Sequence, residues 1–525
     1  MTARSSRSGS RGASEESLQK PRGSIHARVQ LVGPEHFGIV CVDCAKARSK
    51  WLLADFYGNV VVPPTPVAHN RVELDFMTSQ VRRTCQERGL RDVIVAIERT
   101  GRYHHLVRDA FRRSQFETRI VHPFTSKRFR QPADPDNKTD DKDLAAIHRA
   151  TTTGFALIEP QLDITWQTLQ LLARHRRDLV RKTSLLACQI REHLDAAWPG
   201  YGALFSMLWE SKVAFSLFRN YVSPQALVEA GGTGICAWLR GQKSHFQLAT
   251  IQTVLSWAQQ AAPGEATALV HRRLALAKLD DHQRKILEII ALERELAYYL
   301  SQVPYVLLLS IPGINVVWAA EFAGEMGPIE HYLNARTITG RAGLFPNRYQ
   351  SDQVDHPNGR LARRANRRLR GVLLGIADTL IGCNHHFGVL AARWRALGKD
   401  PRDSHVKVAL RFARIAFSMV AGRQVFRHPC VRERHTILDK LLAFHREHDT
   451  PWDQTLADLH RTIKHVPPKE HAAEAKPLAE QLHNLRRPHP GPRGPQLLGD
   501  ILAIVLARLG VGLVQSKEPG ESNPT

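Results

Sequence analysis

The chain has 525 residues, enough for two or three domains and at least one substantial hydrophobic core. Its 43% hydrophobic and 23% charged residues are ordinary for a soluble globular protein, which argues against a fibrous or wholly disordered chain. The charge balance is unusual, because 73 Lys and Arg residues face 50 Asp and Glu residues, a formal net charge of +23. Each cation placed on a phosphate releases condensed counterions, so this surplus favours a nucleic-acid partner over a merely basic protein.

The cysteines and the apolar segments indicate a protein of a reducing compartment. Seven cysteines and no N-terminal signal peptide predict a cytoplasmic, nucleoid-associated protein. Cys41 and Cys44 form a C-x-x-C pattern, but no second pair lies nearby in the sequence, so buried thiols are favoured over a zinc site. The apolar run over residues 497–514 contains two charged residues and predicts a packed helix, not a membrane span.

The first half of the chain predicts a basic tail followed by an α/β domain. Residues 1–35 are rich in Ser, Gly and Arg and predict a disordered tail. Residues 36–158 alternate strand and helix signals, and these indicate a mixed α/β sheet. The expected strands cover residues 37–42, 51–54, 60–62, 93–97 and 118–121, and the expected helices cover residues 70–88 and 103–114 and open near Thr139.

The remainder predicts an all-α arrangement. Residues 159–303 are expected to form a helical, coiled-coil region, in which helices over 163–198 and 272–300 either pair as an antiparallel coiled coil or pack inside a bundle. The heptad pattern is carried by Leu172, Leu179 and Leu186 in the first helix and by Leu279, Ile286, Ile290 and Leu300 in the second. Residues 304–425 predict a separate helical domain, and residues 426–525 a helical, then Pro-rich extension.

Four carboxylates stand where a catalytic site is expected. Asp43 follows the first strand and Glu98 a later one, while Asp140 and Asp143 share one face of the helix that opens at Thr139. Carboxylates packed closely repel one another unless cations neutralise them, and hard ions such as Mg²⁺ suit oxygen ligands. Taken singly, these residues are also typical of helix N-caps and strand-end surface charges.

These residues stand in the motifs D-x-A-K, E-x-T-G-x-Y and K-T-D-x-x-D, and this ordered set resembles the DEDD insertion-sequence transposases related to the pilin-gene invertases. The resemblance implies a ribonuclease-H-like (RuvC-type) N-terminal domain. It also implies that Asp43, Glu98, Asp140 and Asp143 are both catalytic and Mg²⁺ ligands, whereas Asp141 falls on a position that the family does not use.

A Pro-Gly turn over residues 309–315 precedes a helix, and the free backbone N–H groups of such a turn suit a phosphate. The turn, with Gly313 at its centre, resembles the helix-hairpin-helix turn in the second domain of the same family. Asn315, which tolerates positive φ, replaces a second glycine of the family pattern. A plain helix-start turn is the alternative.

The segment over residues 342–352 is similar to the A-G-L-x-P segment of the family, which is followed by a serine. The resemblance implies that Ser351 is a nucleophile that joins covalently to DNA, with Tyr349 as the other candidate and a polar loop as the alternative. Asp352 stands where the family usually has glycine, which changes the local backbone requirements.

Six arginines follow at a spacing of three to four residues, which predicts one basic helical stripe along DNA or RNA phosphates. They are Arg360, Arg363, Arg364, Arg367, Arg368 and Arg370. Asn366, Leu369 and Arg370 fit the N-x-x-L-R pattern of the family, and Ala365 replaces its usual glycine. A solvated basic face is the alternative.

The resemblance covers about residues 36–200 and 304–425 and implies a DNA transposase. It further implies a phosphoserine link to DNA, a structured bridge RNA that pairs with donor and target DNA, and a homo-oligomer, either a dimer or a tetramer. Two other functions fit the same residues. One is a metal-dependent hydrolytic junction nuclease without a covalent step, and the other is a non-enzymatic nucleic-acid-binding protein derived from a transposase.

Overall fold

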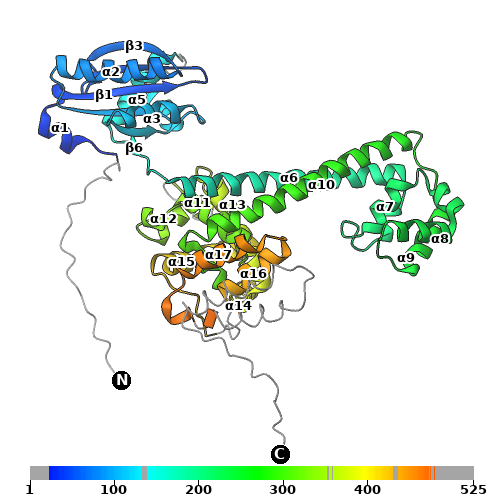
Figure 1. Cartoon of the computed structure of the whole chain (residues 1–525). Helices are drawn as coiled ribbons and strands as arrows, with labels where there is room; N and C mark the ends of the chain where they lie inside the picture. Colours follow the sequence, from blue (N-terminus) through cyan, green and yellow to red (C-terminus); the bar gives the residue numbers. More distant parts are fainter. Residues whose placement is uncertain are drawn as a thin grey trace, which may run out of the picture. The chain divides into compact units, whose positions relative to one another are not determined.

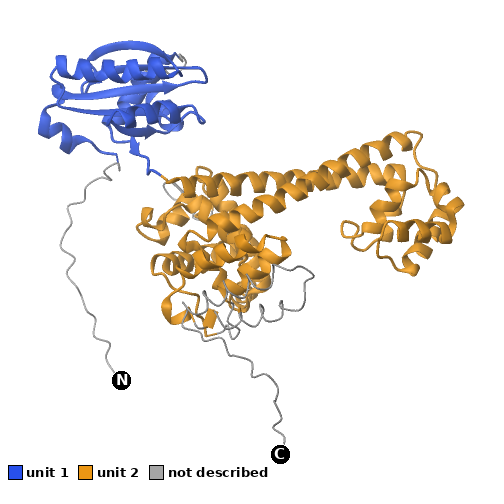
Figure 2. Cartoon of the chain, viewed as in Figure 1, with its two compact units in different colours: residues 1–161 blue, residues 162–525 orange. Residues whose placement is uncertain are grey.

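The computed structural model of the chain describes residues 23–132, 139–351, 354–356, 359–429, 436–471, 473–474 and 478. The chain divides into two compact units, residues 1–161 and 162–525 (Figure 2). Within the described ranges, no helix combines the length and hydrophobicity needed to span a bilayer. The predicted helix over residues 497–514 lies outside the described residues.

Unit 1 is built on a six-stranded mixed sheet in the order β3-β2-β1-β4-β5-β6. Its central strand β1 pairs antiparallel with β2 and parallel with β4, and β4 pairs parallel with β5. The strands are β1 (Phe37–Cys44), β2 (Arg48–Asp55), β3 (Val60–Ala68), β4 (Asp92–Glu98), β5 (Glu117–Val121) and β6 (Leu157–Ile158). The predicted mixed α/β sheet is therefore confirmed.

Helices cover both faces of this sheet (Figure 1). Val40 and Val42 of β1 belong to the core under α2 and α3, whereas Ile39 and Cys41 belong to the core under α1 and α5. Burial on both faces explains why this strand reads as a continuous apolar run. The helices are α1 (His26–Val32), α2 (Arg71–Glu87), α3 (His104–Arg113), α4 (Pro123–Arg130) and α5 (Asp140–Thr152). Cys41 and Cys44 are buried free thiols, as predicted.

The folded part of unit 1 begins earlier than the sequence suggested. Ile25 is 1% exposed, and α1 follows it directly. Arg28 on α1 forms ion pairs with Asp92 at 2.6 Å and Glu117 at 2.7 Å. The predicted disordered tail is therefore wrong for residues 23–35, while residues 1–22 lie outside the described residues.

Unit 2 begins with two long helices, α6 (Ile164–Ala197) and α10 (Ala268–Leu300), which run side by side (Figure 1). Arg176 pairs with Glu293 near one end, and His193 lies 3.0 Å from His271 near the other, so the two helices are antiparallel. This matches the antiparallel pairing that the heptads suggested. Ile286, however, is 38% exposed and does not join the seam, whereas Ile289 is buried.

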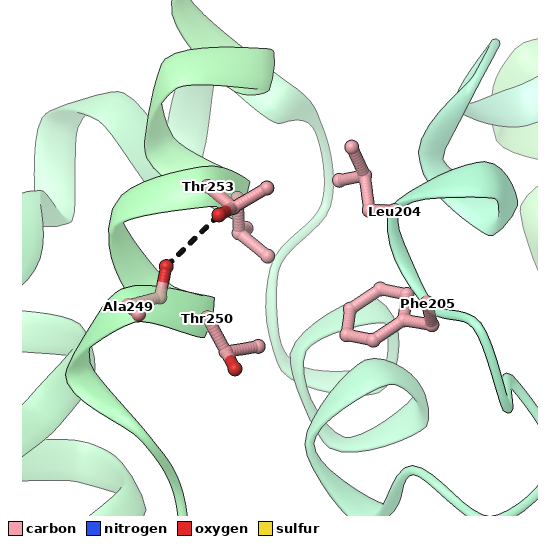
Figure 3. Close-up of a pocket in the computed structure, with 6 residues that line it drawn as sticks. Leu204, Phe205, Ala249, Thr250 and Thr253 are labelled. Atoms are coloured by element: carbon pink, nitrogen blue, oxygen red, sulfur yellow. Dashed lines mark hydrogen bonds between the residues drawn. The ribbon is translucent and has the colours of Figure 1, made fainter.

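The insert between these helices forms a small helical module with its own core around Trp198, Tyr201 and Phe218. Its helices are α7 (Lys212–Asn220), α8 (Pro224–Gly241) and α9 (Leu248–Gln260). A cavity of about 160 Å³ opens beside α9 (Figure 3). Its polar side chains are two threonines, and the Thr253 hydroxyl donates to the Ala249 carbonyl at 2.9 Å, so the cavity lacks acid–base or metal-binding groups.

The remaining helices of unit 2 pack around one large core. They are α11 (Val316–Met326), α12 (Ala335–Ala342), α13 (Arg367–Cys383), α14 (His385–Ala396), α15 (Pro401–Ala421), α16 (Ile437–Glu447) and α17 (Trp452–Ile463). Leu441 and Leu442 of α16 are fully buried in this core. The predicted domain boundary at residue 425 is therefore wrong, because the first part of the C-terminal extension completes the same domain.

The burial of α16 has a measurable consequence. Leu441→Ala should lower the free energy of unfolding of this helical domain by ~2–5 kcal/mol, because it removes a fully buried side chain and leaves a cavity. Leu397→Ala, which truncates a 67% exposed leucine, should change it by about 0.5 kcal/mol or less. Urea denaturation followed by circular dichroism checks both values. Equal effects of the two substitutions would contradict the placement of α16.

Candidate active site

Parallel pairing of β1 with β4 brings two carboxylates to one edge of the sheet. Val42 lies opposite Ile97 in the register, so the next residues, Asp43 and Glu98, lie side by side where the two strands end. In open α/β sheets, functional groups gather at these carboxyl ends of the strands. Successive side chains of a strand point to opposite faces of the sheet, and both faces are buried here. A charged residue in the middle of the strand would therefore be buried, so the acids stand at the strand ends.

The N-terminus of α5 delivers two further predicted carboxylates to the same edge. Thr139 caps the helix by accepting a hydrogen bond from the Lys142 amide, and three aspartates follow in the first turn, where the helix dipole favours negative charge. Leu144 and Ile147 pack α5 against β1 and β4 in the core of unit 1. Asp143 is 6% exposed, so this acid is directed into the protein and not into solvent.

The four predicted carboxylates lie within electrostatic reach of one another. The pKa of Asp43 is raised to about 7, first by burial and then by the charge and hydrogen bonding of Glu98 and the charges of Asp143 and Asp140. A carboxyl group with these neighbours holds its proton near neutral pH unless a cation compensates the repulsion. The sequence analysis thus identified residues that the fold brings together from three elements.

Neighbouring side chains occupy several of these carboxylate oxygens. The Ser126 hydroxyl donates to Glu98, and the Arg130 guanidinium donates to Asp143 in an ion pair. Lys50, opposite Asp43 in the β1–β2 pairing, forms an ion pair with Asp141 at 2.6 Å. Among the residues that the structure describes, no three His, Cys, Asp or Glu side chains are close enough together to hold a metal ion as they stand.

Two of these partners come from α4, which the sequence analysis did not predict. Ser126 and Arg130 lie on this helix of eight residues, which directly follows β5. His122 caps it by accepting a hydrogen bond from the Phe124 amide, and Pro123 occupies its first turn. A proline at the first helical position is a helix-start signal that could have revealed α4.

The Pro-Gly turn of unit 2 joins the 3₁₀ segment η3 (Pro304–Ser310) to α11. Gly313 has φ of 90°, a conformation that favours glycine, and a Cβ there would press on the Cys383 side chain. Asn315 has φ of −103° and caps α11 by accepting from the Trp318 amide at 2.8 Å. Asn315 therefore suits this position because its side-chain oxygen caps the helix, and not because it tolerates positive φ.

Ser351 ends the short strand β7 (Tyr349–Ser351), which pairs antiparallel with β8 (Val354–His356). In this hairpin the backbone of Ser351 lies opposite Val354, and that of Tyr349 opposite His356. Asp352 lies outside the described residues. The two candidate nucleophiles thus belong to one strand of a two-stranded hairpin.

The predicted arginine stripe is wrong as a helical feature. Helix α13 begins only at Arg367, because Asn366 caps it by accepting from the amides of Arg368 and Leu369 at 3.0 Å each. The arginines before Arg367 lie in an irregular segment, not on a helix. The exposed members of the set are Arg360, Arg363, Arg364, Arg367 and Arg368.

Arg370 differs from the other five arginines, because its guanidinium turns inward. It donates to the carbonyl oxygen of Ala342 at 2.8 Å and to that of Ala362, and burial lowers its pKa. Gly343 lies beneath it with φ of 63°, where a Cβ would collide with the guanidinium. The prediction that Arg370 contacts nucleic acid is therefore wrong; it holds the segment between α12 and α13 in place.

Buried ion pairs that the sequence analysis missed connect α6 to α11. Arg174 makes a bidentate pair with Glu325, with N–O distances of 2.7 and 3.0 Å, and Arg176 pairs with Glu321 at 2.8 Å. Glu325 also accepts a hydrogen bond from the Asn366 side chain at 3.1 Å. The cap of α13, next to the exposed arginines, is thus fixed by a network that starts on α6.

Two family models match the chain. A transposase model of the DEDD IS110 type covers residues 40–199, and the model described as "Transposase IS116/IS110/IS902 family" covers residues 305–390. The first range includes all four carboxylates, and the second includes the Pro-Gly turn, Ser351 and the arginine segment. The insert α7–α9 and helices α15–α17 lie outside both matches.

Two relatives from insertion elements are similar over part of the chain. An uncharacterised protein of insertion element IS116 from Streptomyces clavuligerus is 28% identical over 266 residues, 46% of this chain and 61% of its own length. An uncharacterised protein of IS900 from Mycobacterium paratuberculosis is 27% identical over 310 residues, 56% of this chain and 74% of its own length. The match thus spans less than two thirds of the Streptomyces protein. The two matched segments, in their order along the chain, are similar to transposases of the IS116/IS110/IS902 family.

Proposed function

We propose that this chain is a DNA transposase that cuts and rejoins DNA by transesterification, using a carboxylate site in unit 1 and Ser351 in unit 2. The observation that carries the proposal is the convergence of Asp43, Glu98, Asp140 and Asp143, from two strand ends and one helix, on a half-buried position. Such a concentration of acids is costly for the fold, which is typical of a functional site.

The chemistry of this donor set fits a divalent cation with a preference for oxygen, and Mg²⁺ suits it best. Asp43, Glu98, Asp140 and Asp143 would hold it. The pKa of Asp43 is raised by burial first and then by the neighbouring negative charge, which such an ion would neutralise. When bound, such an ion supplies Lewis-acid stabilisation of the phosphate oxygens at the reacting phosphorus. Arg130 and Lys50 already place positive charge beside Asp143 and Asp141.

Ser351 is proposed as the nucleophile on the basis of its family resemblance and its place in the second matched segment. Its oxygen would form a bond to phosphorus while the bond from phosphorus to one DNA oxygen breaks, and the released strand end takes up a proton. The phosphoserine ester conserves the energy of the broken bond. Rejoining is therefore the reverse reaction with a new strand end, and it needs no nucleotide cofactor.

The partners in this proposal are DNA, a structured guide (bridge) RNA and further copies of the chain. The net charge of +23 and the five exposed arginines around the start of α13 support long contacts with phosphate backbones. The guide RNA and a dimer or tetramer rest on the family resemblance. Within such an assembly, carboxylates and serine act on the same DNA strand, from one subunit or from two.

The carboxylate site predicts a specific response to metal. In the presence of EDTA, Asp43→Asn should melt at a higher temperature than the natural protein. The folded state favours the protonated form of Asp43, so the natural protein loses stability as the pH rises from about 4 to about 7, and the variant does not. Added Mn²⁺ or Mg²⁺ should then raise the melting temperature of the natural protein but not of the variant.

Differential scanning fluorimetry at pH 8 measures both effects. Asp75→Asn is the matched control, because it removes an exposed acid of α2 in the same unit and should keep the metal response. An equal metal-induced shift in the natural protein and in Asp43→Asn would rule out the site.

The nucleophile is tested by trapping it. After incubation with Mg²⁺ and DNA that carries the ends of the element, we expect a covalent protein–DNA adduct on a denaturing gel, and mass spectrometry should map it to Ser351. Ser351→Ala should abolish the adduct and strand transfer, whereas Tyr349→Phe should retain both. Strand cleavage that survives Ser351→Ala would instead indicate a hydrolytic nuclease.

The exposed arginines and the inward-turned Arg370 should differ in how their loss affects DNA binding. Arg367→Ala removes an exposed cation, so the slope of log K against log salt should become shallower by about 0.9 for a duplex. Arg370→Ala should leave that slope unchanged but lower the melting temperature, because two backbone carbonyls lose their donor. Fluorescence anisotropy at several NaCl concentrations measures the slopes. A slope changed more by Arg370→Ala than by Arg367→Ala would contradict this assignment.

A further inference from the structure

Two histidines meet between the paired helices α6 and α10, at the end from which the module α7–α9 extends (Figure 1). His193 of α6 and His271 of α10 place their Nδ1 atoms 3.0 Å apart, with ring centroids 5.2 Å apart. The pair is half-buried, and 26% of the His271 side chain is exposed, so small ions reach it from solvent. His271 lies in the gap between the two family matches, so neither match contains the pair.

A carboxylate lies beside the other ring nitrogen of His271. Glu265 Oε2 is 3.6 Å from His271 Nε2, which is the nitrogen that does not face His193. A negative charge there favours the proton on Nε2 and leaves the lone pair on Nδ1. Histidines that bind metals in proteins are oriented in this way, with the second ring nitrogen directed at a carboxylate or a carbonyl. The surroundings of His271 thus suit an electron-pair acceptor at Nδ1.

The segment that carries Glu265 is held against the end of α6. The Glu265 amide donates to the Ala196 carbonyl at 3.3 Å. A Cβ at Gly264 would lie 2.7 Å from the Ala197 carbonyl oxygen, so this close approach depends on glycine. Because the backbone already fixes these groups, a ligand between the helices costs little further ordering of the chain.

The spacing of the two Nδ1 atoms fits a shared metal ion. Two nitrogens that each lie about 2.0–2.1 Å from one ion are about 2.9 Å apart at a right angle and about 3.3 Å apart at a tetrahedral angle. The observed 3.0 Å lies between these values. Imidazole nitrogens suit Zn²⁺, Ni²⁺ and Cu²⁺, whereas Mg²⁺ takes oxygen ligands. The pair is therefore chemically distinct from the carboxylate site of unit 1.

Without a metal, the pair is a hydrogen bond in which one Nδ1 donates its proton to the other. With His271 protonated on Nε2, His193 is the donor. Metal binding then requires the His193 proton to move from Nδ1 to Nε2, so both rings stay neutral and offer their lone pairs to the ion. Within the described ranges no third His, Cys, Asp or Glu side chain joins this pair, so water molecules complete the coordination.

We propose that His193 and His271 bind a transition-metal dication of the imidazole-preferring class, with Zn²⁺ as its representative, and that Glu265 is the positioning residue of this site. The bound ion joins the end of α6 to the start of α10 and closes the chain around the insert, residues 194–270. A metal clip of this kind stabilises the fold most where the closed loop is long. The inference uses no residue of the carboxylate site and does not depend on the proposed function.

The test compares the natural protein with His193→Asn, both as untagged full chains freed of metal with EDTA and then titrated with Zn²⁺ in excess Mg²⁺. The asparagine amide still hydrogen-bonds to His271 but is a poor zinc ligand. The variant should therefore melt near the natural protein in EDTA. It should bind Zn²⁺ at least roughly tenfold more weakly and lose the rise in melting temperature that Zn²⁺ causes.

Isothermal titration calorimetry and differential scanning fluorimetry measure these effects. Zn²⁺ that enters the carboxylate site does so in both proteins and cancels in the comparison. His245→Ala is the matched control, because it removes an exposed histidine between α8 and α9 and should keep the zinc response. Equal zinc stoichiometry and affinity in the natural protein and in folded His193→Asn overturns the proposal.

Glu265→Gln tests the positioning role and keeps the proposal testable if His193→Asn does not fold. The Glu265 side chain is 63% exposed, so its replacement leaves the packing intact. We expect Zn²⁺ binding weakened by up to roughly tenfold, with the same melting temperature in EDTA. Unchanged zinc affinity in this variant contradicts the role of Glu265.

Electron paramagnetic resonance with one equivalent of Cu²⁺ identifies the ligands directly. The natural protein should show hyperfine coupling to two imidazole nitrogens, and His193→Asn should lose at least one of them. A spectrum with oxygen ligands alone overturns the histidine site, because the ion then lies among carboxylates. That same result leaves the proposed function standing.

Discussion

The repulsion among carboxylates at one edge of the sheet is the constraint on which unit 1 depends. Asp43 is half-buried next to Glu98, and burial of like charges disfavours their ionised forms. Nearby donors stabilise these carboxylates: Arg130 forms an ion pair with Asp143, and Ser126 donates a hydrogen bond to Glu98. Both donors lie on α4, which packs against α5, so the strand ends, α4 and α5 are tied to the same charges. A fold that keeps such a cluster gives up some stability to do so.

Unit 2 uses charge in the opposite sense, because its buried acids are paired. Glu325 on α11 binds Arg174 of α6 and Asn366 at the start of α13, so one carboxylate fixes three segments. Buried pairs of this kind add little net stability, but breaking one leaves an uncompensated charge, so they specify one arrangement. The backbone that carries the exposed arginines after Asn366 therefore has a defined position.

Local patterns were sufficient to predict strands β1–β5 and helices α2, α3 and α5 of unit 1, because β1 and β4, for example, are continuous apolar runs whose ends carry the acids. The positions of Asp43 and Glu98 followed from parallel pairing, which brings strand ends together. Contacts between residues that are far apart in the chain could not be predicted from the sequence. The sequence of α1 resembles a polar tail, because this helix is stabilised by burial of Ile25 against strands that are distant in the chain. The arginine spacing fits a helix over residues 360–370, but the cap at Asn366 starts that helix late.

The module α7–α9 has a hydrophobic core that is separate from the large core of the other helices of unit 2. It joins the rest of the chain only through the paired helices α6 and α10, and it falls in the gap between the two family matches. Mutations inside it are therefore separated from the large core of unit 2 by the length of that helical pair. Evolution can exchange, enlarge or remove such a module as a unit, so differences among relatives have a natural place to accumulate there.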